Sequence, residues 1–179
     1  MVRQLLSRTD IQINAALQGG RTPLSLACQE CHVDVLRQLL KCTDIQVNLA
    51  DQGNRTPLHF ACLKGRPDVV CQLLSHADVQ VNLADQDGHT PLHFASFKGH
   101  TNVVHQLLSR PDIQVNRIAQ DDKTPLHVAW QAGHIDVVRQ LLSCADIQVN
   151  PADQDGPTPS FGLVKWASLL WRIIFGRSS

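Results

Sequence analysis

The chain repeats itself every 34 residues, and this period restricts its fold more than any other feature of the sequence. The tripeptide Thr-Pro-Leu recurs once per period, beginning at Thr22, Thr56, Thr90 and Thr124. The segment Asp-Ile-Gln-Val-Asn, with small variations, keeps the same spacing and starts at Asp10, Asp44, Asp78, Asp112 and Asp146. A period of this length indicates an array of units that each pack only against their neighbours.

Each unit has the pattern of two short helices followed by a turn. The Thr-Pro pair starts the first helix, because the threonine oxygen caps free N–H groups and proline suits the first helical position. In the second unit this helix is predicted over residues 57–64 and ends at Gly65, which readily adopts a left-handed conformation. The second helix carries one apolar stripe, formed by Val69, Val70, Leu73 and Leu74. Helices this short are unstable alone, so the sequence predicts a solenoid held together by stacking.

The first helices share the pattern T-P-L-H-x-A, present as TPLHFA from Thr56 and Thr90, TPLHVA from Thr124, and TPLSLA from Thr22. With the Gly-His, Val-Val and Leu-Leu pairs that follow, the chain resembles the ankyrin repeat family over residues 1 to about 159. The resemblance implies an all-α fold with short β-hairpin loops, an ankyrin-type helical solenoid of stacked antiparallel helix pairs with an L-shaped section. It also implies that partner proteins bind along the hairpin tips and the first helices.

The resemblance divides the chain into four full repeats and two irregular ends. The repeats are expected at residues 21–54, 55–88, 89–122 and 123–156, after a truncated half repeat at residues 1–20. Residues 2–7 have the same sequence as residues 138–143, which belong to a second helix. This identity favours an N-terminally truncated fragment over a half repeat that acts as a cap.

The repeat pattern is lost in residues 157–179, a degenerate C-terminal tail. As a helix this tail is amphipathic, with Lys165, Ser168 and Arg172 on a narrow polar face and a wide apolar remainder. The favoured interpretation is that the tail covers the open end of the stack. Two others stay open: residues 160–179 insert at a membrane surface, or the tail is translated outside the natural reading frame or splice pattern.

Three departures from the family pattern bear on the backbone. The period is one residue longer than the usual ankyrin period, and because the extra residue recurs in every copy the stack should stay regular. Cys31 stands where other units have glycine, so we expect it in the left-handed conformation. The hairpin tips are expected to share that conformation, at Gly20, Asn54, Gly88, Asp122 and Gly156.

The segment CQECH at residues 28–32 matches the haem-attachment pattern C-x-x-C-H and half of a zinc site. Alignment with the other units argues against both, because Cys28 shares its slot with Cys62, Ser96 and Trp130, and no second ligand pair lies at a useful spacing. We therefore expect no metal, haem or other cofactor. The six cysteines are too sparse for a disulfide scaffold, and the N-terminus has no secretory signal. Reduced thiols and a cytoplasmic location, or a nuclear one, are expected.

The nine histidines do not predict an active site, because most of them recur at fixed slots of the repeat. A catalytic residue acts once, in one pocket, whereas His59, His93 and His127 share one position. The resemblance implies that these histidines fasten neighbouring repeats through hydrogen bonds. The chain also lacks G-x-S-x-G, Gly-rich phosphate-loop and H-E-x-x-H motifs. We expect no catalytic residue and no enzyme activity.

Residues that differ between repeats are the candidates for recognising a partner. A mildly basic row just before the Thr-Pro pairs is formed by Arg21, Arg55, His89 and Lys123. Surface slots of the first helices supply the other candidates, Leu63, Lys64, Phe97, Lys98, Trp130 and Gln131. Large apolar side chains exposed beside basic ones are typical of interface hot spots, and Leu63, Phe97 and Trp130 are expected to be such side chains. We hypothesise a groove that takes an acidic segment with apolar side chains.

The sequence thus predicts a monomeric, non-catalytic scaffold or adaptor that binds a partner protein along the concave face of the stack. The formal net charge is zero at pH 7, which argues against broad binding to nucleic acid. Two alternatives stay open. The chain is the ankyrin region of a larger regulatory protein, such as a kinase, ubiquitin ligase or channel, or it is a membrane-surface adaptor that uses its C-terminal amphipathic helix.

Replacing Cys31 by glycine is expected to stabilise the array. A non-glycine residue in the left-handed conformation costs roughly 1–2 kcal/mol, and the substitution removes that cost. Thermal unfolding followed by circular dichroism should show a higher melting temperature for Cys31→Gly than for the unaltered chain. A lower melting temperature would refute the expected stabilisation.

Overall fold

The computed structural model describes residues 12–149 of the 179-residue chain. These residues form eight helices in four sequential pairs: α2 (Pro23–Gln29) with α3 (Val33–Leu39), α4 (Pro57–Lys64) with α5 (Pro67–Leu74), α6 (Pro91–Lys98) with α7 (Thr101–Leu108), and α8 (Pro125–Gln131) with α9 (Ile135–Leu142). The expectations for residues 1–11, for Gly156 and for the tail at 157–179 lie outside the described residues.

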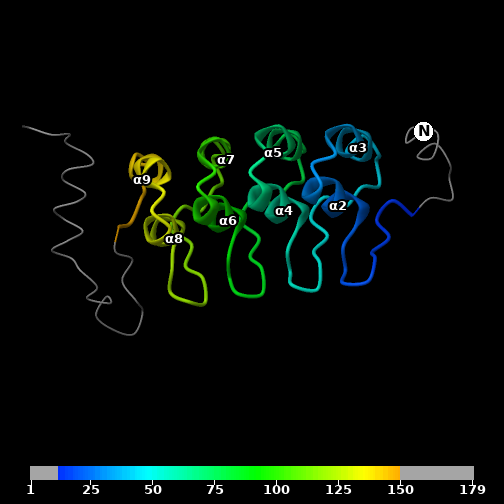
Figure 1. Ribbon diagram of the computed structural model, residues 1–179. Coiled ribbons are helices and arrows are strands. Elements are labelled where there is room, and N and C mark those ends of the chain that lie inside the picture. Colours follow the sequence, from blue (N-terminus) through cyan, green and yellow to red (C-terminus); the bar gives the residue numbers. More distant parts are fainter. Residues whose placement is uncertain (1–11, 150–179) are drawn as a thin grey trace, which may run out of the picture.

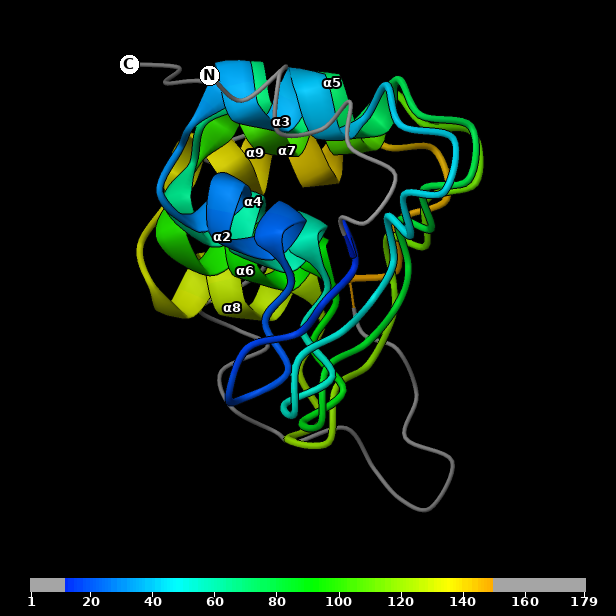
Figure 2. The same ribbon diagram turned by 90° about the vertical axis from the view of Figure 1, so that its right-hand side faces the viewer.

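The helix pairs stack side by side in two rows (Figure 1). Helices α2, α4, α6 and α8 form an inner row next to the hairpin loops, and α3, α5, α7 and α9 form an outer row. Viewed along the stack, the helices and the hairpin loops meet at an angle and give an L-shaped section (Figure 2). We call the inside of this angle the concave face. The arrangement confirms the predicted all-α solenoid of stacked helix pairs.

The loops that connect successive repeats are hairpin-shaped turns, and residues 12–149 contain no β-strand. The second turn is closed by the Asp51 N–H, which donates to the Arg55 carbonyl (3.0 Å), and by the Asn54 N–H, which donates to the Asp51 carbonyl (3.0 Å). A backbone bond also joins neighbouring tips, as between the Gln52 N–H and the Gly19 carbonyl (3.0 Å). The expected β-hairpins are therefore present as tight turns that are too short to form strands.

The Thr-Pro pairs start the inner helices as predicted. Thr56 is the N-cap of α4, and His59 completes a capping box by accepting the Thr56 N–H at Nδ1 (3.0 Å). Helices α4 and α6 end at glycines with positive φ, Gly65 (66°) and Gly99 (72°). The prediction of left-handed geometry is also confirmed at the non-glycine positions, Cys31 (φ 59°), Asn54 (58°) and Asp122 (58°).

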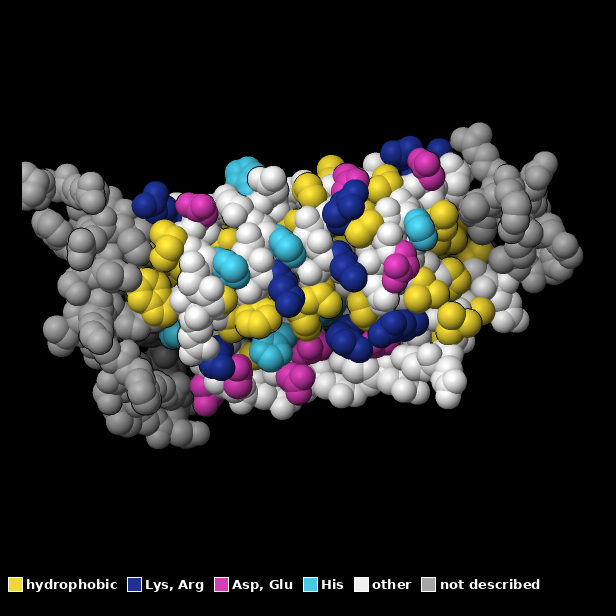
Figure 3. Space-filling model, in the orientation of Figure 1, with side chains coloured by type: hydrophobic (Ala, Val, Ile, Leu, Met, Phe, Trp, Pro, Cys, Tyr) yellow, Lys and Arg dark blue, Asp and Glu magenta, His cyan; other side chains and the backbone are white. Residues whose placement is uncertain are grey.

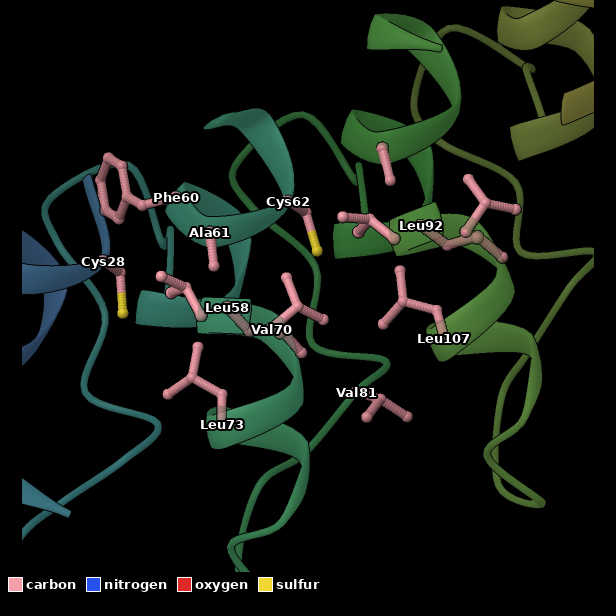
Figure 4. Packing of buried hydrophobic residues seen from close by; sticks show 14 of the residues in the cluster. Cys28, Leu58, Phe60, Ala61, Cys62, Val70, Leu73, Val81, Leu92 and Leu107 are labelled. Carbon is pink, nitrogen blue, oxygen red and sulfur yellow. The ribbon is translucent and has the colours of Figure 1, made fainter. Parts of the chain in front are cut away.

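The apolar stripes of the outer helices form one core that continues through the stack. Val70 and Leu73 of α5 are fully buried, as is the neighbouring Val69, and they point toward Leu58 of α4 (Figure 4). Figure 4 shows these side chains filling the space between the two helices of one repeat and reaching toward the next repeat. No repeat could bury this stripe alone, which is why the fold requires stacking.

A ladder of asparagine side chains crosses from each repeat to the next. Asn48 donates through Nδ2 to the Asp78 carbonyl (2.7 Å), and its Oδ1 accepts the Gln80 N–H (3.0 Å). The same pair of bonds is made by Asn14, Asn82 and Asn116. The asparagine that ends the Asp-Ile-Gln-Val-Asn segment is therefore a link between repeats, a role that the sequence analysis did not assign.

The glycines that end α4 and α6 have a second role, because the histidine ring of the next repeat packs against each of them. A Cβ atom at Gly99 would lie 2.5 Å from Nδ1 of His134. A Cβ atom at Gly65 would meet the ring of His100 in the same way. These positions thus need glycine both for the positive φ and for the close approach of the next repeat.

Cys31 is accommodated because the following repeat departs from the pattern at the matching contact. Arg66 stands in the slot that His100 and His134 occupy in later repeats. No imidazole ring therefore packs against residue 31, and the side chain has to meet only the strain of its positive φ. At this boundary both residues of the glycine–histidine contact are replaced, the glycine by Cys31 and the histidine by Arg66.

Alanine should be tolerated much less well at Gly99 than at Gly133. Both glycines have positive φ, 72° and 76°, so the backbone strain of the two substitutions is the same. No described atom lies within 4 Å of a Cβ at Gly133, whereas a Cβ at Gly99 collides with His134. Overpacking of this kind costs about 1–3 kcal/mol, and urea denaturation should show that extra loss for Gly99→Ala. Equal losses for the two variants would show that the ring contact is unimportant.

Candidate protein-binding groove

A groove of about 610 Å³ lies on the concave face, between the hairpin loops and helices α6 and α8. It is lined by Gly53, Arg55, Asp85, Gln86, Asp87, His89, His93, Phe94, Phe97, Asp121, Lys123, Val128, Gln131 and Ala132. Figure 3 shows hydrophobic and basic side chains intermixed on this side of the molecule, with acidic side chains along both its lower and its upper edge. The helices thus supply a largely apolar wall, and the hairpins supply a polar floor.

The structure brings five of the ten predicted binding residues together in the groove, namely Arg55, His89, Phe97, Lys123 and Gln131. The other five lie outside the lining, and Lys64 and Lys98 among them are exposed in the last turns of α4 and α6. Arg21 lies nearer the N-terminal end of the stack, where its guanidinium is 5.4 Å from the centre of the Phe60 ring.

Among the three apolar side chains that were expected to be exposed, Phe97 is exposed and the other two are not. The Phe97 side chain is 52 % exposed, and Lys98 Nζ lies 5.1 Å from the centre of its ring. The expectation is wrong for Leu63 and Trp130, which are half-buried. Trp130 packs against the core, because its slot is the one where Cys62 and other small residues are buried.

Three of the four residues of the basic row, Arg55, His89 and Lys123, lie beside carboxylates of the hairpins. Arg55 donates to Asp51 Oδ2 through Nη2 (2.9 Å) and Nε (3.2 Å), and Lys123 Nζ lies 2.9 Å from Asp121 Oδ2. His89 lies between two aspartates, with Nδ1 3.7 Å from Asp85 and Nε2 3.7 Å from Asp121. Arg55 and Lys123 are therefore engaged by carboxylates of this chain, which weakens the electrostatic attraction that these two residues would offer to an acidic partner segment.

Two of these carboxylates are held firmly in the ionised form. Burial acts to raise the pKa of Asp51, but hydrogen bonds and positive charge from Arg55, with the Gly53 N–H, outweigh it and lower the pKa. Burial likewise acts to raise the pKa of Asp121, and the hydrogen bond and charge of Lys123 reverse that effect. Both aspartates stay charged at neutral pH and belong to fixed ion pairs.

The histidines of the T-P-L-H segments join the wall of the groove to its floor. His93 accepts the Thr90 N–H at Nδ1 (3.1 Å), so its proton is on Nε2, which donates to the Lys123 carbonyl of the next repeat (3.1 Å). His59 makes the equivalent bonds one repeat earlier (3.0 and 3.1 Å). Burial lowers the pKa of both histidines to about 4, which keeps them neutral at pH 7. The expected role in fastening repeats is confirmed for His59 and His93.

One cluster in the groove has the donor atoms of a metal site. Ligand atoms of Asp85, Asp87 and His89 lie within 4.8 Å of one another. Asp85 Oδ1, however, already accepts the N–H groups of Asp87 (3.0 Å) and His89 (2.8 Å), and Asp51 makes matching bonds in the preceding hairpin. The geometry of this turn accounts for the cluster, so it does not by itself indicate a bound ion.

Cys28 of the CQECH segment is a core residue, as is Cys62 in the equivalent slot of α4. Cys28 is fully buried, and burial, with a small contribution from Cys31, raises the pKa of its thiol. Burial raises the pKa of Cys62 in the equivalent slot of α4 in the same way. Thiols with raised pKa values are unreactive at neutral pH, so both act as small apolar core residues.

A family model of ankyrin repeats, which spans three copies, matches residues 1–85 and 77–153. The chain therefore belongs to the ankyrin repeat family. Members of this class are generally protein–protein interaction modules and are typically non-catalytic. The comparison with curated proteins found no match. Within residues 12–149, no helix is long and apolar enough to cross a bilayer.

The stability of the stack should fall between pH 7 and pH 5 because of His59 and His93. Their pKa values in the folded state, about 4, lie below the value near 6.5 in the unfolded chain. The unfolded chain therefore binds protons first, and the stabilisation is complete above pH 6.5 and is lost as the pH falls toward 4. At pH 5 the expected loss is about 2 kcal/mol for each histidine. Urea denaturation at the two pH values measures it.

The double variant His59→Gln and His93→Gln separates these residues from other titrating groups. It should be less stable than the unaltered chain at pH 7 and should show a much smaller difference between pH 7 and pH 5. His105→Gln, a change at an exposed position of α7, is the matched control and should keep the full pH dependence. An undiminished pH dependence in the double variant would contradict the assignment.

Proposed function

We propose that the protein is a non-catalytic scaffold or adaptor that binds a partner protein along the concave face, in the groove between the hairpins and helices α6 and α8. The observation that carries this proposal is Phe97, whose side chain is 52 % exposed at the wall of a groove of about 610 Å³. An aromatic side chain held in water on a fixed helix gains free energy when a partner covers it. Phe97 therefore has the character of an interface anchor.

The rigidity of the groove supports the same proposal. The bond from His93 to the Lys123 carbonyl ties the wall to the floor, and a bond from the Gln120 N–H to the Asp87 carbonyl (2.9 Å) ties adjacent tips together. A surface that is already ordered loses little conformational freedom on binding, so more of the contact energy remains as affinity.

The cysteines support the cytoplasm, or the nucleus, as the proposed cellular location. All six thiols are free, and two of them fill core slots, which supports a reducing compartment, the cytoplasm or the nucleus. If the chain is the ankyrin region of a larger regulatory protein, the proposed binding site is the same groove. The membrane-surface alternative depends on residues 160–179, which lie outside the described part of the chain.

The double variant Phe97→Ala and Lys98→Ala tests the proposed function. Affinity purification from a cell lysate, with the full chain as bait, should recover partner proteins that the variant retains at least about tenfold less well, because it lacks an interface anchor. Both side chains are exposed, so its free energy of unfolding should stay within about 0.5 kcal/mol of the unaltered chain.

Arg117→Ala with Ile118→Ala is the matched control. It also removes one exposed basic and one exposed apolar side chain, from a loop segment that does not line the groove. The control should retain the same partners as the unaltered chain. Partners that persist in the groove variant, or that disappear equally in both variants, would rule out the concave groove as their binding site.

A further inference from the structure

Two successive hairpins hold an aspartate in the same slot with different partners. In the first, the Arg55 guanidinium lies 2.9 Å from Asp51 and places a permanent positive charge beside that carboxylate. In the second, Asp85 occupies the slot, and the residue in place of the arginine is His89, with Nδ1 3.7 Å away. A guanidinium carries a permanent positive charge, and an imidazole does not. The second hairpin thus has no permanent cation in the place where the first one has Arg55.

Further negative charge lies beside this position. Asp87 is exposed, and its carboxylate is within 4.8 Å of the Asp85 carboxylate and the His89 ring. In the described part of the chain, no lysine or arginine lies within 4.0 Å of either carboxylate, and Lys123 is engaged by Asp121 at 2.9 Å. The floor of the groove therefore presents two carboxylates, Asp85 and Asp87, that form no ion pair with a lysine or arginine of residues 12–149.

An apolar surface faces this charge across the same groove. Phe94 and Phe97 of α6 and Val128 of α8 line the wall, and Phe97 is the most exposed of the three. A ligand that fills the groove has to satisfy both sides at once. It needs a cationic group for the floor and an apolar group for the wall.

We propose that the groove binds an extended peptide segment of a partner protein in which a lysine or arginine stands next to a large apolar residue. The cationic side chain reaches Asp87, with the Asp85 charge behind it, and the apolar side chain covers Phe97. An acidic segment would meet the aspartates with like charge, which is unfavourable. A free amine would satisfy the aspartates and leave Phe97 in water. This inference rests on the proposed function and names the chemistry of the partner.

Selection of random dodecapeptides displayed on phage, with the full chain as bait at pH 7.5, tests the inference. The recovered peptides should be enriched in a lysine or arginine adjacent to leucine, isoleucine, phenylalanine or tryptophan. A synthetic copy of the most enriched peptide should bind about fivefold more weakly to Asp87→Asn, the loss expected for one exposed ion pair. Its affinity for Phe97→Ala should fall about tenfold or more.

Two controls isolate the ion pair. Asp136→Asn removes an equally exposed carboxylate from the outer helix α9 and should leave the affinity unchanged. Replacing the cationic residue of the peptide by glutamine should abolish the difference between the unaltered chain and Asp87→Asn, because the two changes remove the same interaction. A difference that persists with the glutamine peptide would contradict a direct contact.

The other outcomes are distinguishable. Peptides enriched in aspartate or glutamate, or peptides that depend on Phe97 and not on Asp87, would overturn the cationic partner and leave the proposed function standing. Peptides that are indifferent to both variants would overturn the groove as a binding site, and the proposed function with it. Recovery of no peptide would overturn the extended segment, while the purification with the Phe97 and Lys98 variant still tests the proposed function.

Discussion

The stack exists because side chains of each repeat reach across the boundary to the next repeat. Asn48 bridges to the following loop with two hydrogen bonds, His93 donates to the carbonyl of residue 123, and His134 packs against Gly99. Helices of seven or eight residues are unstable on their own, so these contacts and the shared apolar core turn them into one body. The asparagine bonds recur every 34 residues from Asn14 to Asn116, and each of the two histidine contacts recurs in two successive repeats.

The residues that recur for stability leave other positions free to differ, and the groove is built at those positions. The slot before the Thr-Pro pair holds Arg55 in one repeat and His89 in the next, and Gly53 of the first hairpin is replaced by Asp87 in the second. That exchange replaces a permanent cation 2.9 Å from the hairpin aspartate by a histidine ring nitrogen 3.7 Å from it. Small differences on a regular frame thus create a local chemistry without any change of fold.

The fold was predictable from the sequence because the 34-residue period fixes the helices, their caps and even the positive φ of Cys31. The site was predictable only in part. The spacing places Lys123 on a hairpin, but it does not show that Asp121 pairs with it, since that depends on loop geometry. The prediction that Trp130 is exposed was wrong, because its side chain packs against the core. The asparagine ladder was missed because its partners are backbone groups, which leave no mark in the sequence.

Hydrogen exchange of backbone amides, compared between Asn82→Ala and Phe97→Ala, tests the central claim that recurring residues hold the stack and differing residues recognise partners. Asn82 bonds to the Asp112 carbonyl and the Gln114 N–H, so its loss should speed exchange in both repeats that it joins. Phe97→Ala should leave the exchange of the whole stack unchanged, because this side chain is exposed. Equal acceleration in the two variants, or none in Asn82→Ala, would contradict the account.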